Sequence, residues 1–305
     1  MASLTARLTR TLLRALVQPT FTPEFGLKRQ RQRLNALQQL MPMPFGVRKQ
    51  ITPCGGVPAW RLTPATVHDA GSAQNTGASV MLYLHGGGYV VGSPTSHGEM
   101  VARIARQCSI DTWLIDYRLA PEHPAPAALE DALSAYRTLS AQGPVIIAGD
   151  SAGGGLSLAL TAAVLEQQLP RPQALVLFSP WCDLSCSGAS ISERKEREVL
   201  LQTDWILFAA EQYAGQQDLD NPHISPLHAD FSDFPPTLIQ VGSEEILYDD
   251  SVRLAQRMRH AGVEVTLSEY PQMWHVFQLH AGYMPEARQA LNEIAAFTRQ
   301  QQKRE

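Results

Sequence analysis

Short apolar runs alternate with helical patterns from about residue 78 onward, and this alternation limits the possible folds more than any other feature of the chain. The runs include SVMLYL, TWLIDY, VIIAG, ALVLFS and TLIQVG, and helical segments such as AALEDALSAYRTLS and LSLALTAAVLEQQ separate them. Strands joined by helical connections of this length form a parallel sheet with helices on both faces, and runs such as LVLF suit strands buried on both sides. The sequence therefore predicts an α/β fold.

Two segments do not follow the alternation. Residues 1–45 and 186–222 are helical in pattern, rich in polar residues and interrupted by proline. We predict that they form two parts of a helical cap over a core built from residues 46–185 and 223–305. In an open parallel sheet the ligand site lies at the carboxyl ends of the strands, so functional residues are expected where VIIAG, LYLHG and LIQVG end.

Composition argues against several classes of function. The chain has 305 residues, 44% of them hydrophobic, which is enough for one large domain with a substantial core. It has 25 Lys and Arg residues against 29 Asp and Glu residues, so it lacks the basic surplus typical of nucleic-acid binding. The cysteines lack CxxC or zinc-ligand spacing and no secretory signal pattern precedes them, so we expect free thiols, no metal site and a cytoplasmic location.

The N-terminal stretch MASLTARLTRTLLRALVQP is basic and apolar. Its leucines recur every four residues, at Leu4, Leu8, Leu12 and Leu16, and arginines interrupt the apolar run. This pattern predicts an amphipathic helix rather than a signal peptide or a membrane span, so no stable membrane insertion is expected. Such a helix can lie on a membrane surface or pack its leucines on the rest of the protein. We favour packing, because no lipidation motif accompanies the helix.

A G-x-S-x-G motif, Gly149 to Gly153, stands between a predicted strand and a predicted helix. In a tight strand-to-helix turn the neighbours of the serine must be very small, because a Cβ there would collide with the adjacent strand or helix. The turn would expose the Ser151 hydroxyl and place the N–H of Ala152 at a helix N-terminus, which favours negative charge. The pattern predicts Ser151 as a nucleophile, and the alternative is a glycine-rich turn with an incidental serine.

The sequence His85-Gly86-Gly87-Gly88 follows an earlier predicted strand. Consecutive glycines leave backbone N–H groups free to approach a substrate oxygen. We predict that Gly87, Gly88 and Ala152 donate to an oxyanion, and that His85 braces the loop. A flexible loop or a phosphate cradle is the alternative, but neither a P-loop lysine nor GxGxxG spacing is present.

His275 follows the last predicted strand, VEVTLSEY, and precedes the terminal helix. The chain order of serine first and histidine last matches that of α/β-hydrolases, so we predict His275 as the general base. His280 is its close competitor. His223 and His228 lack a further ligand at metal spacing and are expected to be loop residues.

These motifs together resemble the hormone-sensitive-lipase-like branch of the α/β-hydrolase esterases, the bacterial carboxylesterases and acetyl-hydrolases. HGGG, GDSAGG, DYRLAPEHPAPAALEDA, SPWCDLS and the MWHVF stretch carry the resemblance, which extends over nearly the whole chain from about residue 45. It implies a Ser-His-acid esterase with a cap built from the N-terminal segment and from an insertion after the sixth core strand. It also implies Ser151 as nucleophile, His275 as base, and Gly87, Gly88 and Ala152 as oxyanion donors. The family further suggests a homodimer and small or medium acyl esters as substrates.

The stretch VGSEEILYDD, residues 241–250, offers several acids for the third catalytic position. The resembling family most often has an Asp there in a D-P-L-x-D-E pattern, and superposing the two patterns places Glu245 on the acid. Asp249 and Asp250 precede a helical pattern and are expected at the helix start, where carboxylates favour the dipole. Asp249 is the alternative acid, Glu244 has no assigned role, and Glu244 and Glu245 as solvated loop residues are a further alternative.

We therefore predict a serine carboxylesterase that needs no metal or cofactor and acts on short to medium acyl esters. Candidate walls of the substrate pocket, each of which can equally belong to the core, are Tyr89, Trp181, Trp205, Phe208 and Trp274. Amide, lactone or peptide hydrolysis on the same triad is an alternative. A non-catalytic receptor of this fold is another, and His275 argues against it because such receptors keep the serine and lose the histidine.

Overall fold

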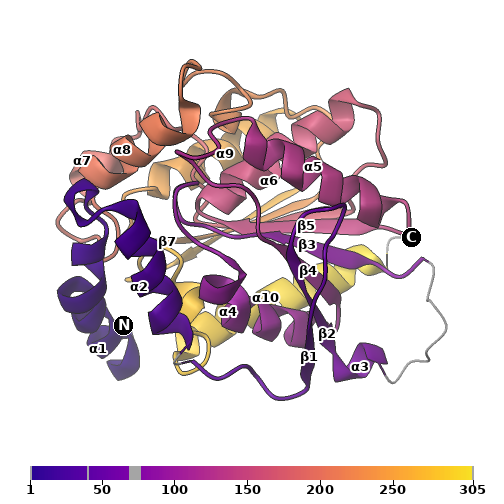
Figure 1. Ribbon diagram of the computed structural model, residues 1–305, viewed down its shortest axis with the longest axis horizontal. Helices are drawn as coiled ribbons and strands as arrows, with labels where there is room; N and C mark the ends of the chain where they lie inside the picture. Colours follow the sequence, from indigo (N-terminus) through magenta and orange to yellow (C-terminus); the bar gives the residue numbers. More distant parts are fainter. Residues whose placement is uncertain (1, 40, 69–76, 304–305) are drawn as a thin grey trace.

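The computed structural model describes residues 2–39, 41–68 and 77–303 (Figure 1). In this part of the chain, an eight-stranded sheet has the order β1-β2-β4-β3-β5-β6-β7-β8. The strands are β1 Val47–Ile51, β2 Ala59–Pro64, β3 Val80–Leu84, β4 Asp111–Ile115, β5 Val145–Asp150, β6 Ala174–Phe178, β7 Thr237–Gly242 and β8 Val265–Tyr270. The β1/β2 and β2/β4 pairs are antiparallel and the remaining pairs are parallel. The predicted α/β fold with a mostly parallel sheet is confirmed.

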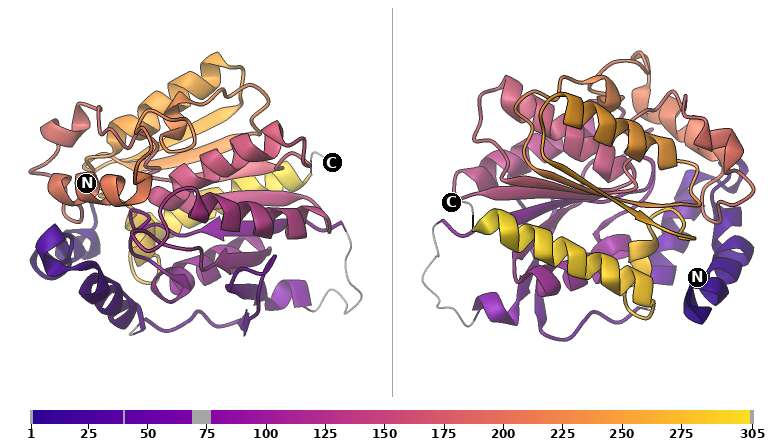
Figure 2. Two further views of the ribbon diagram at one scale, coloured as in Figure 1. Left: turned by 45° about the horizontal axis from the view of Figure 1, so that its top comes forward. Right: turned by 180° about the vertical axis from the view of Figure 1, so that it is seen from behind.

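Helices cover both faces of the sheet (Figure 2). The helices α4 Pro94–Cys108 and α10 Pro285–Gln302 cover one face, and α5 Ala127–Ser140, α6 Ala152–Glu166 and α9 Tyr248–His260 cover the other. The central strands bury both faces, because successive side chains of a strand point to opposite sides. In β5, Ile146 packs in the core beneath α4 and α10, while Ile147 packs in the core beneath α5 and α6. Both faces of β5 are thus apolar, and this explains its continuous hydrophobic run.

The N-terminal segment and the segment after β6 lie together at the carboxyl ends of the parallel strands (Figure 1). The first contains α1 Leu4–Leu12, the π-helical turn η1 Leu13–Val17 and α2 Leu27–Gln39; the second contains α7 Ser190–Glu193 and α8 Thr203–Ala214. The Trp205 indole N–H donates to Gln30 Oε1 at 2.9 Å, so the two segments contact each other directly. Short elements complete the fold: α3 Ala65–His68, and the 3₁₀ turns η2 Gln18–Thr20, η3 Pro23–Phe25, η4 Pro226–His228 and η5 Phe277–His280.

The predicted packing of the N-terminal leucine row on the protein is wrong. Leu4, Leu8, Leu12 and Leu16 are 66%, 58%, 57% and 55% exposed. Arginine hydrogen bonds orient the helix the other way: Arg10 Nη2 donates to the Arg197 carbonyl and Arg14 Nη2 to the Glu196 carbonyl, both at 2.6 Å. The face that turns toward the protein buries small residues and one leucine, namely Ala6, Thr9 and Leu13. In the described part of the chain, no helix is long and apolar enough to span a membrane.

Candidate active site

Ser151 lies in the turn between β5, which ends at Asp150, and α6, which begins at Ala152. Its φ of 52° and ψ of −121° are strained for a residue with a side chain, and such strain persists where the surroundings impose it. The Ser151 N–H donates to the Phe178 carbonyl at 2.8 Å, and the Trp181 N–H donates to the Ser151 carbonyl at 2.9 Å. A Cβ at Gly153 would overlap the Leu84 carbonyl oxygen. The turn therefore requires glycine beside the serine and aims the serine out of the sheet.

The glycine loop after β3 lies beside this turn. Gly87 and Gly88 have φ values of 116° and 60°, which side chains disfavour, and both residues line the same cavity as Ser151. A Cβ on Gly88 would stand 2.9 Å from the Trp205 ring. Ala152 is the first residue of α6, so its N–H has no partner within its own helix. Gly87 and Gly88 thus bring the backbone of the glycine loop to the cavity that Ser151 lines, and Ala152 follows Ser151 directly.

Buried polar residues hold the two loops in place. Asp150, directly before Ser151, accepts the Tyr83 hydroxyl at 2.8 Å, and its Oδ2 lies 3.3 Å from His97 Nε2. Burial alone would raise the pKa of Asp150, but the His97 charge and these hydrogen bonds hold it below its usual value. His85 stacks on Tyr117 with ring centroids 4.2 Å apart, and burial together with the charge of His97 lowers its pKa to about 3. A neutral, stacked His85 agrees with its predicted bracing role.

His275 and Glu245 form a buried pair from the loops after β8 and β7. His275 Nδ1 lies 2.7 Å from Glu245 Oε2, and Glu245 Oε1 accepts the Ser179 hydroxyl at 2.9 Å and the Gly242 N–H at 2.6 Å. Burial alone would lower the pKa of His275, but the hydrogen bond and charge of Glu245, with the charge of Glu198, raise it above its usual value. His275 and Ser151 line one cavity of about 240 Å³. The imidazole thus has a fixed carboxylate at one nitrogen and access to the cavity of the serine.

Comparisons with known proteins place this site in a family. Residues 81–279 match the family model of the alpha/beta hydrolase fold, which is more than half of the chain. The chain belongs to this family. Among its curated relatives, an acetyl-hydrolase of Streptomyces hygroscopicus is 45% identical, with 72% of this chain and 75% of the relative covered. An esterase of Acinetobacter venetianus is 36% identical over 74% and 76% of the two chains.

Solved structures, among them an esterase from the bacterial hormone-sensitive lipase family, superpose on nearly the whole chain. The structure of EstE5 matches with a TM-score of 0.92 and 34% identity, covering 99% of this chain and all of that one. A hormone-sensitive lipase from a metagenome library matches with a TM-score of 0.87 and 36% identity over the same shares. The predictions of the α/β-hydrolase fold, of the hormone-sensitive-lipase-like branch and of a carboxylic ester hydrolase are therefore confirmed.

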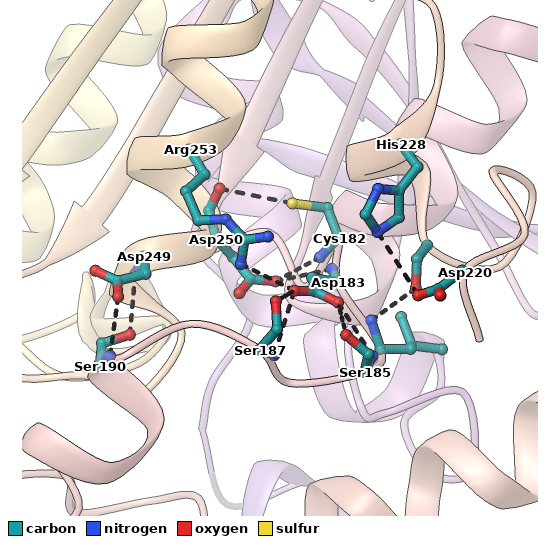
Figure 3. Close-up of polar contacts among 12 residues, drawn as sticks. Cys182, Asp183, Ser185, Ser187, Ser190, Asp220, His228, Asp249, Asp250 and Arg253 are labelled. Carbon is teal, nitrogen blue, oxygen red and sulfur yellow. Dashed lines mark hydrogen bonds and ion pairs between the residues drawn. The ribbon is translucent and has the colours of Figure 1, made fainter.

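Two other acids of the VGSEEILYDD stretch in this esterase, Asp249 and Asp250, form hydrogen bonds away from His275 (Figure 3). Asp249 Oδ2 accepts the Ser190 N–H, and Asp250 Oδ2 accepts the N–H groups of Cys182 and Asp183, each at 2.9 Å. Both acids stand in the first turn of α9, as expected, but their carboxylates tie the helix to the chain after β6 rather than cap it. Glu244 lies 3.7 Å from Arg10 in the N-terminal segment. In the described contacts, Glu245 is thus the acid of this stretch that bonds to His275.

Glu198 is a buried acid that the sequence analysis did not single out. Its Oε1 accepts the N–H groups of Val199 and Leu200 at 2.7 and 2.8 Å, and its Oε2 accepts the Ile246 N–H at 3.3 Å. Burial raises the pKa of Glu198, as does the charge of Glu245, whereas the charge of His275 lowers it. The sequence gave no sign that Glu198 is buried near His275, because it stands in the polar stretch SERKEREVLL beside similar, exposed acids.

The remaining histidines of the esterase have other surroundings. His280 lines the cavity, but burial lowers its pKa to about 4 and its Nδ1 lies 3.0 Å from the Tyr283 hydroxyl rather than from a carboxylate. His223 lies on a loop, as expected, 3.9 Å from Glu166, whereas His228 is the last residue of the 3₁₀ turn η4 and lies 4.0 Å from Asp220. In the described part of the chain, no group of three His, Cys, Asp or Glu residues could hold a metal ion.

The cavity walls differ from the aromatic set suggested by the sequence. Trp205 lines the cavity, whereas Tyr89, Trp181, Phe208 and Trp274 do not line it in the described structure. Tyr89 instead stacks on Tyr213 with centroids 3.6 Å apart. Apolar residues of the N-terminal segment form much of the wall: Leu13, Val17, Phe21, Leu34, Leu37 and Met41. Large aromatic residues near a motif fill the core as readily as a pocket, so the sequence could not separate the two.

Proposed function

We propose that this esterase hydrolyses short to medium acyl esters through Ser151, His275 and Glu245. The observation that carries the proposal is the buried His275–Glu245 hydrogen bond, together with one apolar cavity that both His275 and Ser151 line. A strained serine at a helix N-terminus, a histidine held by a carboxylate and a glycine loop are the parts that acyl transfer requires. We further propose that residues 1–45 and 186–222 act as a cap over a core of residues 46–185 and 223–305.

In the proposed reaction, His275 removes the hydroxyl proton of Ser151 while the serine oxygen attacks the ester carbonyl. The carbonyl oxygen becomes an oxyanion that accepts hydrogen bonds from the N–H groups of Gly87, Gly88 and Ala152, each contributing about 2–4 kcal/mol of transition-state stabilisation. The protonated His275 then gives its proton to the leaving alcohol, and a water molecule repeats the sequence on the acyl-enzyme to release the acid. Glu245 holds the imidazole orientation and stabilises the imidazolium.

The homodimer and the cytoplasmic location stay predictions.

A matched pair of substrates tests this proposal. With p-nitrophenyl butyrate, we expect a pre-steady-state burst of about one p-nitrophenolate per chain if deacylation is the slower step, followed by steady turnover. The matched amide, the p-nitroanilide of butyric acid, should react far more slowly, because its leaving group is poorer and the site has to protonate an amine. Stopped-flow absorbance measures both. Equal or faster hydrolysis of the anilide would favour an amidase, and no release from the ester would refute the enzymatic proposal.

The buried Glu198 predicts a shift in the pH profile. His275 must be neutral to accept the serine proton, so kcat/KM falls as the pH drops through the pKa of His275. The negative charges of Glu245 and Glu198 stabilise the imidazolium and raise this pKa, with a further contribution from Asp150. Glu198→Gln removes one of these charges, so its acidic limb should move to lower pH. Glu196→Gln, at an exposed acid two residues away, should leave the limb in place. A limb that stays fixed or moves to higher pH in Glu198→Gln would contradict the prediction.

A further inference from the structure

The outward face of the N-terminal segment carries an exposed row of leucines. Leu4, Leu8, Leu12 and Leu16 are each more than half exposed on α1 and η1, while the opposite face of the same helix is buried against the protein. Isolated apolar residues on a surface are ordinary, but four leucines aligned along one helix form a continuous apolar stripe. The arginine contacts of Arg10 and Arg14 with the chain after β6 hold the helix in this orientation.

The same segment is basic although the whole chain is acidic. Residues 2–39 contain seven Lys and Arg residues and one Glu, whereas the rest of the chain contains 18 Lys and Arg residues and 28 Asp and Glu residues. Exposed cations include Arg7 on α1 and Lys28, Arg29 and Arg33 on α2. Helix α2 is joined to the end of the leucine row, because Arg33 Nη2 donates to the Leu16 carbonyl at 2.6 Å. A leucine stripe bordered by cations is complementary to a surface that is apolar inside and anionic outside.

The segment that carries the stripe also forms part of the wall of the candidate active-site cavity. Leu37 on α2 is 40% exposed and lines the cavity, and Leu13 and Val17, from the turn that follows α1, line it too. One segment therefore presents leucines to the exterior and apolar side chains to the cavity that holds Ser151. The surface proposed below for docking and part of the cavity wall thus belong to the same segment of the chain.

We propose that α1, η1 and α2 dock this esterase on an anionic lipid surface, with the Leu4–Leu8–Leu12–Leu16 stripe among the acyl chains and the flanking cations at the headgroups. The docking is peripheral, because the helix lies along the interface rather than across it. It brings the cavity to the lipid, so the substrates it favours are esters that partition into a lipid phase. Binding to lipid does not require the catalytic serine, so the docking can fail or succeed independently of the proposed hydrolysis.

Vesicle sedimentation of the full chain tests the docking. We expect the protein to sediment with vesicles of phosphatidylcholine containing 30% phosphatidylglycerol, and much less with phosphatidylcholine alone or in 0.5 M NaCl. Leu8→Ser combined with Leu12→Ser should weaken binding to the anionic vesicles by at least about tenfold, because two large apolar side chains no longer enter the acyl region. Ile51→Ser, at a 72% exposed residue on β1, is the matched control and should bind as the native protein does. The Ser151→Ala protein should also bind as the native protein does.

The double variant should keep its native circular dichroism and its activity on p-nitrophenyl acetate in vesicle-free buffer. Neither Leu8 nor Leu12 is among the described residues that line the cavity. Absence of sedimentation with anionic vesicles, or equal sedimentation of native and double-variant protein, would overturn the proposal. A concentration-dependent dimer in light scattering that the two serines abolish, without vesicle binding by the native protein, would also overturn it and assign the stripe to a second copy of the chain.

Discussion

Ser151→Ala will lower kcat for p-nitrophenyl butyrate by roughly 10⁴- to 10⁶-fold, because the proposed acyl-enzyme forms on the Ser151 hydroxyl. The oxyanion donors and the cavity would remain, so a small residual rate over the uncatalysed reaction is expected. The turn should keep its shape, since its backbone hydrogen bonds to Phe178 and Trp181 do not use the serine hydroxyl. Steady-state kinetics measures the loss, and thermal unfolding checks that the variant is folded.

Ser192→Ala provides the matched control for this loss. Ser192 is an exposed serine on α7, and its hydroxyl donates to the Ala189 carbonyl at 3.1 Å. Its removal should leave kcat within about twofold, as is usual for surface changes that leave stability within about 0.5 kcal/mol. If folded Ser151→Ala kept a tenth or more of the native kcat, Ser151 would not be the nucleophile.

Glu245→Gln will lower kcat by roughly 10³- to 10⁴-fold through the tautomer of His275. In the native protein Glu245 Oε1 faces the Gly242 N–H and Oε2 faces His275 Nδ1. A glutamine must direct its oxygen to the Gly242 N–H, so its NH₂ group faces His275. Nδ1 then has to accept a hydrogen bond, the proton moves to Nε2, and the imidazole can no longer take the serine proton. The loss should appear in kcat more than in KM.

Asp249→Asn is the decisive companion variant. Asp249 is the alternative acid in the sequence, but its carboxylate accepts the Ser190 N–H, and an asparagine oxygen can accept the same bond. We expect kcat within about threefold of the native value for this surface-like change. A large loss in Asp249→Asn with little loss in Glu245→Gln would transfer the role of the acid to Asp249.

Local sequence patterns were sufficient to predict features that depend on residues close together in the chain. The turn at Ser151 requires small neighbours because β3 and α6 lie against it, and the strand–glycine–helix order of the sequence already predicts this crowding. The alternation of strands and helices likewise predicts the parallel sheet. The choice of Glu245 over Asp249 needed the family pattern, since both acids follow the same strand. The 2.7 Å contact with His275 is a property of two loops 30 residues apart in the sequence.

Patterns failed where burial depends on distant partners. Glu198 resembles its exposed neighbours in the sequence, yet it is buried, and its carboxylate accepts the N–H of Ile246, 48 residues away. The leucine row of α1 has the spacing of a packed face, but carbonyls after β6 bind Arg10 and Arg14 and turn the leucines outward. An amphipathic pattern identifies two faces of a helix without stating which face meets the protein.

The sequence by itself determined the α/β-hydrolase fold and the family, and it singled out Ser151 as the candidate nucleophile, because the strand–helix alternation and the motifs with closely spaced glycines are local features of the sequence. Only the tertiary structure decided which carboxylate holds His275, which side chains line the cavity and which way the leucines point. These features are set by contacts between loops far apart in the chain, and no short stretch of sequence contains both sides of such a contact.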